Sequence, residues 1–281
     1  MPHTENEGAR LYWTEQGSGP PVLLIMGLSF THEMWFRVVP ALRERYRTIL
    51  FDNRGMGRSD CPRGPYSIRQ LARDAAAVMD AAGVESAHIV GASMGGMIAQ
   101  ELALRQPSRV RSLVLGCTSY SGMFARWPHF RRGPRINWSR ATRLERERSL
   151  RSLLYADATP LDRIEEDIEI RCGCSWSYKG FWNQFAGILA WNAYWRLPRI
   201  KIPVMVIHGE EDHLVPPENG KVIARRIPGA RWELLPNAGH VLVTDQPELS
   251  SRLLLEFLDE QAGREAGALH AAATGERAEL G

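Results

Sequence analysis

The stretch His88-Ile89-Val90-Gly91-Ala92-Ser93-Met94-Gly95-Gly96 joins an apolar strand to a segment that suits a helix, with Ser93 at the junction. Its Gly-x-Ser-x-Gly pattern predicts a sharp strand-turn-helix in which the serine takes strained backbone angles. Gly91 and Gly95 have no Cβ, so the neighbouring strand and helix can approach the turn closely. Ser93 is therefore expected to stand clear of the sheet as a nucleophile. The backbone N–H of Met94, at the start of the helix, would point into the same space and stabilise an oxyanion.

A serine nucleophile on such a turn needs an acid and a histidine, and both follow it in sequence, each just after a later strand. The apolar run Pro203–Gly209 predicts a buried strand, and the polar loop Glu210–Pro216 comes directly after it. A second strand is predicted over Arg231–Leu235, followed by Pro236–His240. His240 can accept and return a proton because imidazole titrates near neutral pH.

Four carboxylates compete for the part of the acid, which holds the imidazole in one tautomer and stabilises its charged form. Glu210, Glu211 and Asp212 lie in the polar loop, and Asp245 lies beyond the histidine. Asp245 opens the stretch Asp245-Gln246-Pro247-Glu248, a pattern typical of a helix start, and we expect it to cap the last helix.

Four motifs in this order resemble the α/β-hydrolases of the esterase, lactonase and haloperoxidase-like branch, over roughly residues 10–262. They are the serine turn, the loop Gly209-x-x-Asp212-x-x-Val215-Pro216, the pair Gly239-His240, and Asp52–Ser59 after an earlier strand. The resemblance implies the α/β-hydrolase fold and a triad of Ser93, Asp212 and His240. It selects Asp212 as the acid because this residue stands at the family spacing within the loop.

The resemblance also implies an oxyanion hole built from two backbone N–H groups. One belongs to Met94 and the other to Leu28, which follows the third strand. Members of the family usually carry His-Gly at that point, whereas this chain has Met26-Gly27. A backbone donor does not need the histidine side chain, so Leu28 is still expected to supply the second N–H.

Short apolar runs without polar alternation occur at Thr48–Phe51, His88–Val90 and Ser112–Leu115. Such runs predict strands that are covered on both faces. Helix signals alternate with them, including a capping box at Ser67–Gln70. The chain is therefore predicted to form a doubly wound, mostly parallel α/β sheet. Sites in such sheets lie at the carboxyl ends of the strands, where the serine, the acid and the histidine are all placed.

The alternation breaks between residues 118 and 199, a segment rich in aromatic residues. We predict an α/β core formed by residues 1–117 and 200–262, with residues 118–199 inserted as a helical cap. Residues 263–281 are small and polar, and they are predicted to form a disordered tail.

Aromatic residues of the cap are candidates for the wall of a substrate pocket, although some must belong to the core of the cap. Sequence alone does not sort these two groups. The candidates for the pocket are Trp35, from the segment after the predicted oxyanion loop, and Trp176, Phe181, Trp182, Trp191 and Trp195 from the cap.

Composition excludes several classes of protein. A net charge of +3 without a recognition motif argues against a nucleic-acid partner, and no apolar run is long enough for a membrane span. The amino terminus lacks the features of a signal peptide, so a cytoplasmic location is the default expectation. The four cysteines, Cys61, Cys117, Cys172 and Cys174, are expected to be reduced thiols, and one Cys-x-Cys pair without a second cluster does not indicate a metal site.

Charge is uneven within the predicted cap. Arginines are frequent between Arg126 and Arg151, and acidic residues between Asp157 and Glu169. We expect solvated or mutually paired faces, with an anion-recruiting surface as the alternative.

These features predict a serine hydrolase that cleaves a carboxylic ester or lactone of an apolar small molecule, with or without a ring, through an acyl-enzyme on Ser93. Neither a metal nor an organic cofactor is required, and the oligomeric state is left open. Carbon-carbon bond hydrolysis, amide hydrolysis, perhydrolysis and hydroxynitrile cleavage are alternatives, because similar triads on one fold support different reactions. A ligand receptor with a retained triad is an alternative from another class.

Overall fold

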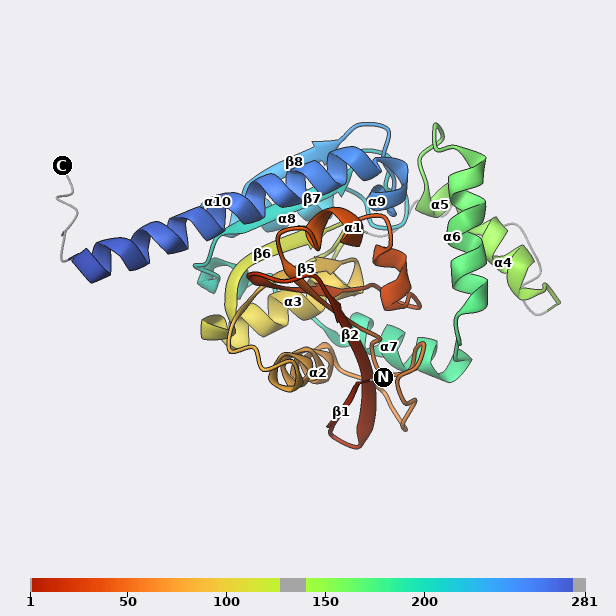
Figure 1. Ribbon diagram of the computed structural model, residues 1–281. Coiled ribbons are helices and arrows are strands. Elements are labelled where there is room, and N and C mark those ends of the chain that lie inside the picture. The colour runs from red at the N-terminus through yellow and green to blue at the C-terminus, as the bar shows by residue number, and fades with distance from the viewer. Residues whose placement is uncertain (1, 127–139, 275–281) are drawn as a thin grey trace.

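The computed structural model describes residues 2–126 and 140–274 (Figure 1). Within these residues, an eight-stranded sheet has the order β1-β2-β4-β3-β5-β6-β7-β8. β1 and β2 are antiparallel to their neighbours, and the other strands run parallel, which confirms the predicted sheet. The strands are β1 (His3–Asn6), β2 (Ala9–Gln16), β3 (Pro21–Ile25), β4 (Arg47–Phe51), β5 (Ala87–Ala92), β6 (Val110–Gly116), β7 (Val204–Gly209) and β8 (Arg231–Leu235).

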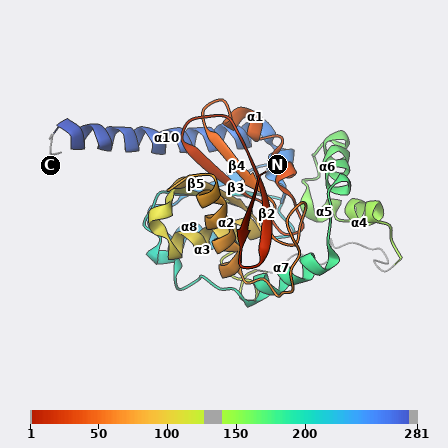
Figure 2. The same ribbon diagram turned by 60° about the horizontal axis from the view of Figure 1, so that its bottom comes forward.

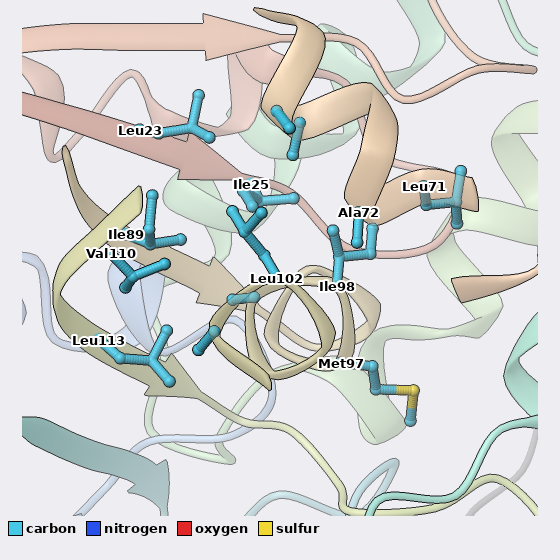
Figure 3. Close-up of a cluster of buried hydrophobic side chains, with 14 of the residues drawn as sticks. Leu23, Ile25, Leu71, Ala72, Ile89, Met97, Ile98, Leu102, Val110 and Leu113 are labelled. Atoms are coloured by element: carbon cyan, nitrogen blue, oxygen red, sulfur yellow. The ribbon is translucent and has the colours of Figure 1, made fainter. Parts of the chain in front are cut away.

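Helices cover both faces of this sheet (Figure 2). One face carries α2 (Ile68–Ala81), α3 (Met94–Arg105) and α8 (Glu218–Arg226), and the other carries α1 (Val39–Leu42) and α10 (Pro247–Thr274), with the short α9 (Leu242–Asp245) before it. Leu23 and Ile25 of β3 belong to the cluster that packs against α2 and α3, and Figure 3 shows Ile25 near Ile98. Val22 and Leu24 pack into the opposite cluster. Burial on both faces explains the unbroken apolar runs of these strands.

The start of α2 forms only the Ser67 half of the predicted capping box, and the Gln70 side chain donates to Glu7 at 3.1 Å. The Ser67 hydroxyl accepts a hydrogen bond from the Gln70 N–H at 3.1 Å, and the helix begins at Ile68. After the helix ends, Gly83 takes a φ of 66°, a left-handed conformation that glycine adopts without strain.

Between β6 and β7 the described chain forms helices without adding a strand to the sheet. They are α4 (Arg143–Ser149), α5 (Arg151–Leu154), α6 (Leu161–Gly173) and α7 (Tyr178–Ala190), and the 3-10 turn η4 (Leu197–Arg199) follows them. Two further 3-10 turns, η1 (His32–Trp35) and η2 (Pro107–Arg109), belong to the core. Both ribbon views place α4, α5 and α6 beside the sheet and away from the far end of α10 (Figures 1 and 2). We call residues 118–199 the cap, of which residues 127–139 lie outside the described part.

The predicted disordered tail is wrong as far as Thr274, because α10 continues to that residue and projects beyond the body of the protein (Figure 1). Its first half is anchored by buried side chains such as Leu254 and Phe257. Beyond Gly263 the sequence is rich in alanine, which has the highest helix propensity, so a helix already nucleated can continue. Residues 275–281 lie outside the described residues.

Candidate active site

Ser93 lies between the end of β5 and the first residue of α3, with φ of 55° and ψ of −122°. A Cβ at Gly91 would clash with the carbonyl oxygen of Gly95, and a Cβ at Gly95 would clash with that of Ile25. The backbone N–H of Ser93 donates to the carbonyl of Gly116 in β6 at 2.8 Å. The strained turn therefore persists because the surrounding backbone fixes it and admits only glycine on either side.

The loop after β3 passes directly against this serine. A Cβ at Gly27 would lie 2.9 Å from the Cβ of Ser93, which is closer than side chains normally approach. Leu28 and Met94, the two predicted oxyanion donors, line the same cavity as Ser93. The Met94 N–H belongs to the first turn of α3, where a helical N–H has no partner within the helix.

Two buried amide side chains hold the loop after β3, and sequence analysis missed both. The Asn53 side chain donates to the Met26 carbonyl at 2.9 Å. Gln184 of α7 accepts from the Ser29 N–H at 3.4 Å and donates to the Arg54 carbonyl at 2.9 Å. Asn53 falls within a quoted family motif, but no sequence signal separates Gln184 from the other polar residues of α7. The cap thus contributes to the position of the loop that carries Leu28.

His240 and Asp212 form a buried pair, with Nδ1 of the histidine donating to Oδ2 of the carboxylate at 2.8 Å. The other carboxylate oxygen accepts the backbone N–H groups of Leu214 and Val215. Nε2 of His208 lies 3.2 Å from Asp212 as well. Burial alone would raise the pKa of Asp212, but the charge and hydrogen bonding of His240, together with His208, hold it below its usual range. Asp212 is therefore ionised at neutral pH and can fix the imidazole tautomer.

Asp245 is not a helix cap, contrary to the sequence expectation. It ends α9, and its carboxylate accepts from the Gly239 N–H at 2.6 Å and from the Thr159 hydroxyl at 2.5 Å. The residue before α10 is Gln246, so Asp245 lies one position too early to be the N-cap of that helix. Burial raises the pKa of Asp245 to about 6. This carboxylate ties the backbone beside the histidine to the cap.

Cys117 is a further buried neighbour of the acid-histidine pair, with its sulfur within 4.8 Å of the ligand atoms of Asp212 and His240. Thiolate, carboxylate and imidazole are all zinc ligands. However, both oxygens of Asp212 already accept hydrogen bonds, and burial raises the pKa of the Cys117 thiol well above its ordinary value. Because Asp212 is already fully hydrogen-bonded to His240 and to the loop backbone, this group of residues is satisfied without a metal ion.

Ser93 and His240 open onto one cavity of about 1000 Å³ that lies between the core and the cap. Its wall is mostly apolar, as expected for a pocket that takes a small organic molecule. Four of the aromatic residues proposed for the pocket lie in this wall: Trp35, Trp176, Phe181 and Trp182.

The other two proposed pocket residues, Trp191 and Trp195, lie outside the cavity. Trp191 is buried in the core cluster, and its indole N–H donates to Glu101 of α3 at 2.9 Å. Trp195 is 79% exposed and stacks edge-on against Tyr194. The sequence expectation fails here because both residues follow α7, where the chain returns to the core and no longer faces the cavity.

Sequence analysis also missed part of the cavity wall. Phe185 and Ile188 of α7 line it together with Phe181. Their spacing of four and three residues places them on one face of the helix. This periodicity was available in the sequence and marks α7 as the main aromatic wall.

The comparison with known families agrees with this fold and site. The model of the alpha/beta hydrolase fold family matches residues 20–247. Because that match spans most of the chain, the protein belongs to the α/β-hydrolase family.

Individual relatives cover nearly the whole chain. RutD of Azorhizobium caulinodans, which is named a carbamate hydrolase, is 33% identical over 92% of this chain and 99% of its own length. The 3-oxoadipate enol-lactonase 2 of Acinetobacter baylyi is 28% identical over 83% of this chain and 86% of its own length. The crystal structure of the enol-lactonase from Burkholderia xenovorans matches with a TM-score of 0.78 and 25% identity, covering 92% of this chain and 100% of that one. The chain is therefore a hydrolase. None of the described helices is long and apolar enough to cross a membrane.

Proposed function

We propose that this protein is a serine hydrolase that cleaves a carboxylic ester or lactone through an acyl-enzyme on Ser93. The observation that carries the proposal is the arrangement around one cavity: a strained serine at the head of α3, and the histidine of a buried acid-histidine pair. A nucleophile and an oriented base that share one substrate space are the requirements for acyl transfer.

In the acylation step, His240 takes the hydroxyl proton of Ser93 while the serine oxygen attacks the substrate carbonyl. The N–H groups of Leu28 and Met94 stabilise the resulting oxyanion. His240 then gives its proton to the alkoxide that leaves, and an acyl-enzyme remains. Asp212 stabilises the imidazolium in both transfers.

In the second step, His240 removes a proton from water, which attacks the acyl-enzyme carbonyl. The tetrahedral intermediate collapses, Ser93 regains its proton, and a carboxylic acid is released. Every charge in the cycle is met by backbone N–H groups or by the acid-histidine pair, so the chemistry needs no metal or organic cofactor.

The cavity favours an apolar substrate over a small polar one such as a carbamate. Its volume of about 1000 Å³ and the aromatic residues of α7 would leave a compact polar molecule with few contacts. The names of the lactonase relatives agree with an ester-type bond, and the cap would select the organic part of the substrate.

A screen of aryl esters, methyl esters and lactones, with wild type and Ser93→Ala compared in each assay, tests this proposal. We expect multiple turnovers on at least one class, with a pre-steady-state burst for activated aryl esters and no turnover by the variant. Stoichiometric cleavage without further turnover would instead favour a receptor with a retained triad. Turnover that survives in Ser93→Ala would contradict the acyl-enzyme.

A further inference from the structure

The cap side of the cavity is strongly positive, although the rest of the wall is apolar. Among the described residues that line it, Arg126, Arg143, Arg146 and Arg171 are arginines and Glu147 is the one carboxylate. Unlike exposed arginines, guanidinium groups at the edge of an apolar cavity act on a ligand through a low effective dielectric.

Two of these arginines are largely fixed by the protein. Arg171 is 6% exposed, forms an ion pair with Glu147, and stacks 4.4 Å from the centre of the Phe30 ring. Arg143 donates to the carbonyls of Arg171 and Cys174. Within the described part of the chain, Nη1 of Arg171 and Nε of Arg143 are buried and have no hydrogen-bond partner.

The helix α4 carries charged side chains on two faces, one that lines the cavity and one that faces solvent. Arg143, Arg146 and Glu147 stand at spacings of three and four residues, so they share the face that lines the cavity. Arg146 donates through Nε to the Ala141 carbonyl at 3.1 Å, and no carboxylate of the described residues pairs with it. Arg148, two residues further along, instead binds Glu165 at 2.8 Å and does not line the cavity.

We propose that the substrate of this hydrolase carries a carboxylate, separated from the reacting carbonyl by an apolar chain or ring, and that Arg146, Arg143 and Arg171 bind it. A carboxylate fits the planar fork of a guanidinium, and it would pair with the charge of Arg146, which lines the cavity without a carboxylate partner among the described residues. The apolar part of the substrate spans the aromatic wall between α4 and Ser93. This inference rests on the proposed ester or lactone hydrolysis and names the substrate class for that site.

Matched ester pairs test the inference. One pair is the p-nitrophenyl ester of octanoic acid and the mono-p-nitrophenyl ester of octanedioic acid, which differ by a terminal carboxylate on the acyl chain. The second pair places the same difference on the alcohol: octyl acetate and the acetate ester of 8-hydroxyoctanoic acid. We expect kcat/KM to favour the carboxylate by about 10-fold in at least one pair, as charge-assisted hydrogen bonds would give.

Two variants on one helix separate recognition from general electrostatics. Arg146→Gln should lower the ratio of kcat/KM between the carboxylate and neutral esters by about 10-fold, mainly through KM. Arg148→Gln removes the same charge from the outer face of α4, and it should leave the ratio unchanged. Equal thermal unfolding of the two variants would exclude a folding defect as the cause.

These measurements can fail for carboxylate recognition and for ester hydrolysis separately. Hydrolysis of both members of each pair at equal rates would overturn carboxylate recognition and leave the serine hydrolase intact. Equal loss of the ratio in the two variants would also overturn it, because long-range charge would then explain the preference. Failure to hydrolyse any ester would count against the proposed function itself.

Discussion

The two walls of the cavity are held in place by different interactions. On the core side, Ser93 is fixed by strained backbone angles and Asp212 by hydrogen bonds to both of its oxygens. On the cap side, the wall consists of aromatic rings and arginines, and one of the rings, Trp182, is 49% exposed. The core side therefore sets the reaction, and the cap side sets which molecule reaches it.

The largest change in kcat/KM is expected for a substitution on the core side, and it would test the comparison between the two walls most strongly. Asp212→Asn should lower kcat/KM by up to about 10⁴-fold, since the amide favours the tautomer of His240 that cannot accept the serine proton. Glu210→Gln is the matched control, because Glu210 is exposed and lies in the same loop. Steady-state kinetics on an aryl ester will show whether only the first substitution has this effect. A similar loss in both variants would mean that the acid has been misassigned.

On the cap side the expected effect is smaller and depends on the substrate. Phe181→Ala should change kcat/KM for a bulky ester by about 10-fold while a small acetate ester is affected less, because the ring lines the cavity.

Trp191→Ala is the matched control for Phe181→Ala, since it also removes an aromatic ring of the cap. Trp191 is buried and bonded to Glu101, so its loss should destabilise the fold by about 3–5 kcal/mol and depress both substrates together. Kinetics on the two esters, with unfolding midpoints, separate the cases. If Phe181→Ala behaved like Trp191→Ala, the aromatic wall would be structural only.

An effect on stability rather than on turnover is expected where the two walls meet, at Asp245. Burial raises its pKa to about 6. The hydrogen bonds from Thr159, Gly239 and Ala156 lower this pKa, but their effect is smaller than that of burial. The folded protein thus holds this proton more tightly than the unfolded chain, whose carboxyl titrates near 3.9. The group therefore contributes stability below about pH 4 that is lost as the pH rises through 6.

Asp245→Asn cannot ionise and should not show this loss. The advantage of wild type over the variant in unfolding free energy should shrink by up to about 3 kcal/mol between pH 4 and pH 8. Urea unfolding of both proteins across this range measures it. A difference that does not depend on pH would show that Asp245 is not protonated in the fold near pH 5.

The difference between the two walls also explains what the sequence could predict. The serine turn, the Asp212 loop and Gly239-His240 are short motifs because close backbone contacts exclude larger residues at fixed spacings. The sheet was predictable from unbroken apolar runs for a similar reason. Among the described residues, no close backbone contact restricts the residue type at Trp195 or Gln184. Their surroundings depend on how the cap packs on the core, which the sequence does not show. The helix beyond Gly263 was missed because alanine-rich segments support both disorder and helix.

Covalent labelling of Ser93 is the most direct test of the central claim. Wild-type protein treated with a fluorophosphonate should lose esterase activity in step with the appearance of one adduct, mapped by peptide mass spectrometry to the peptide containing Ser93. Ser93→Ala should take up no adduct and should retain less than about 10⁻⁴ of the wild-type kcat, while its melting temperature shows an intact fold. An adduct on another residue that abolishes activity, or turnover above a tenth of wild type in Ser93→Ala, would contradict the account.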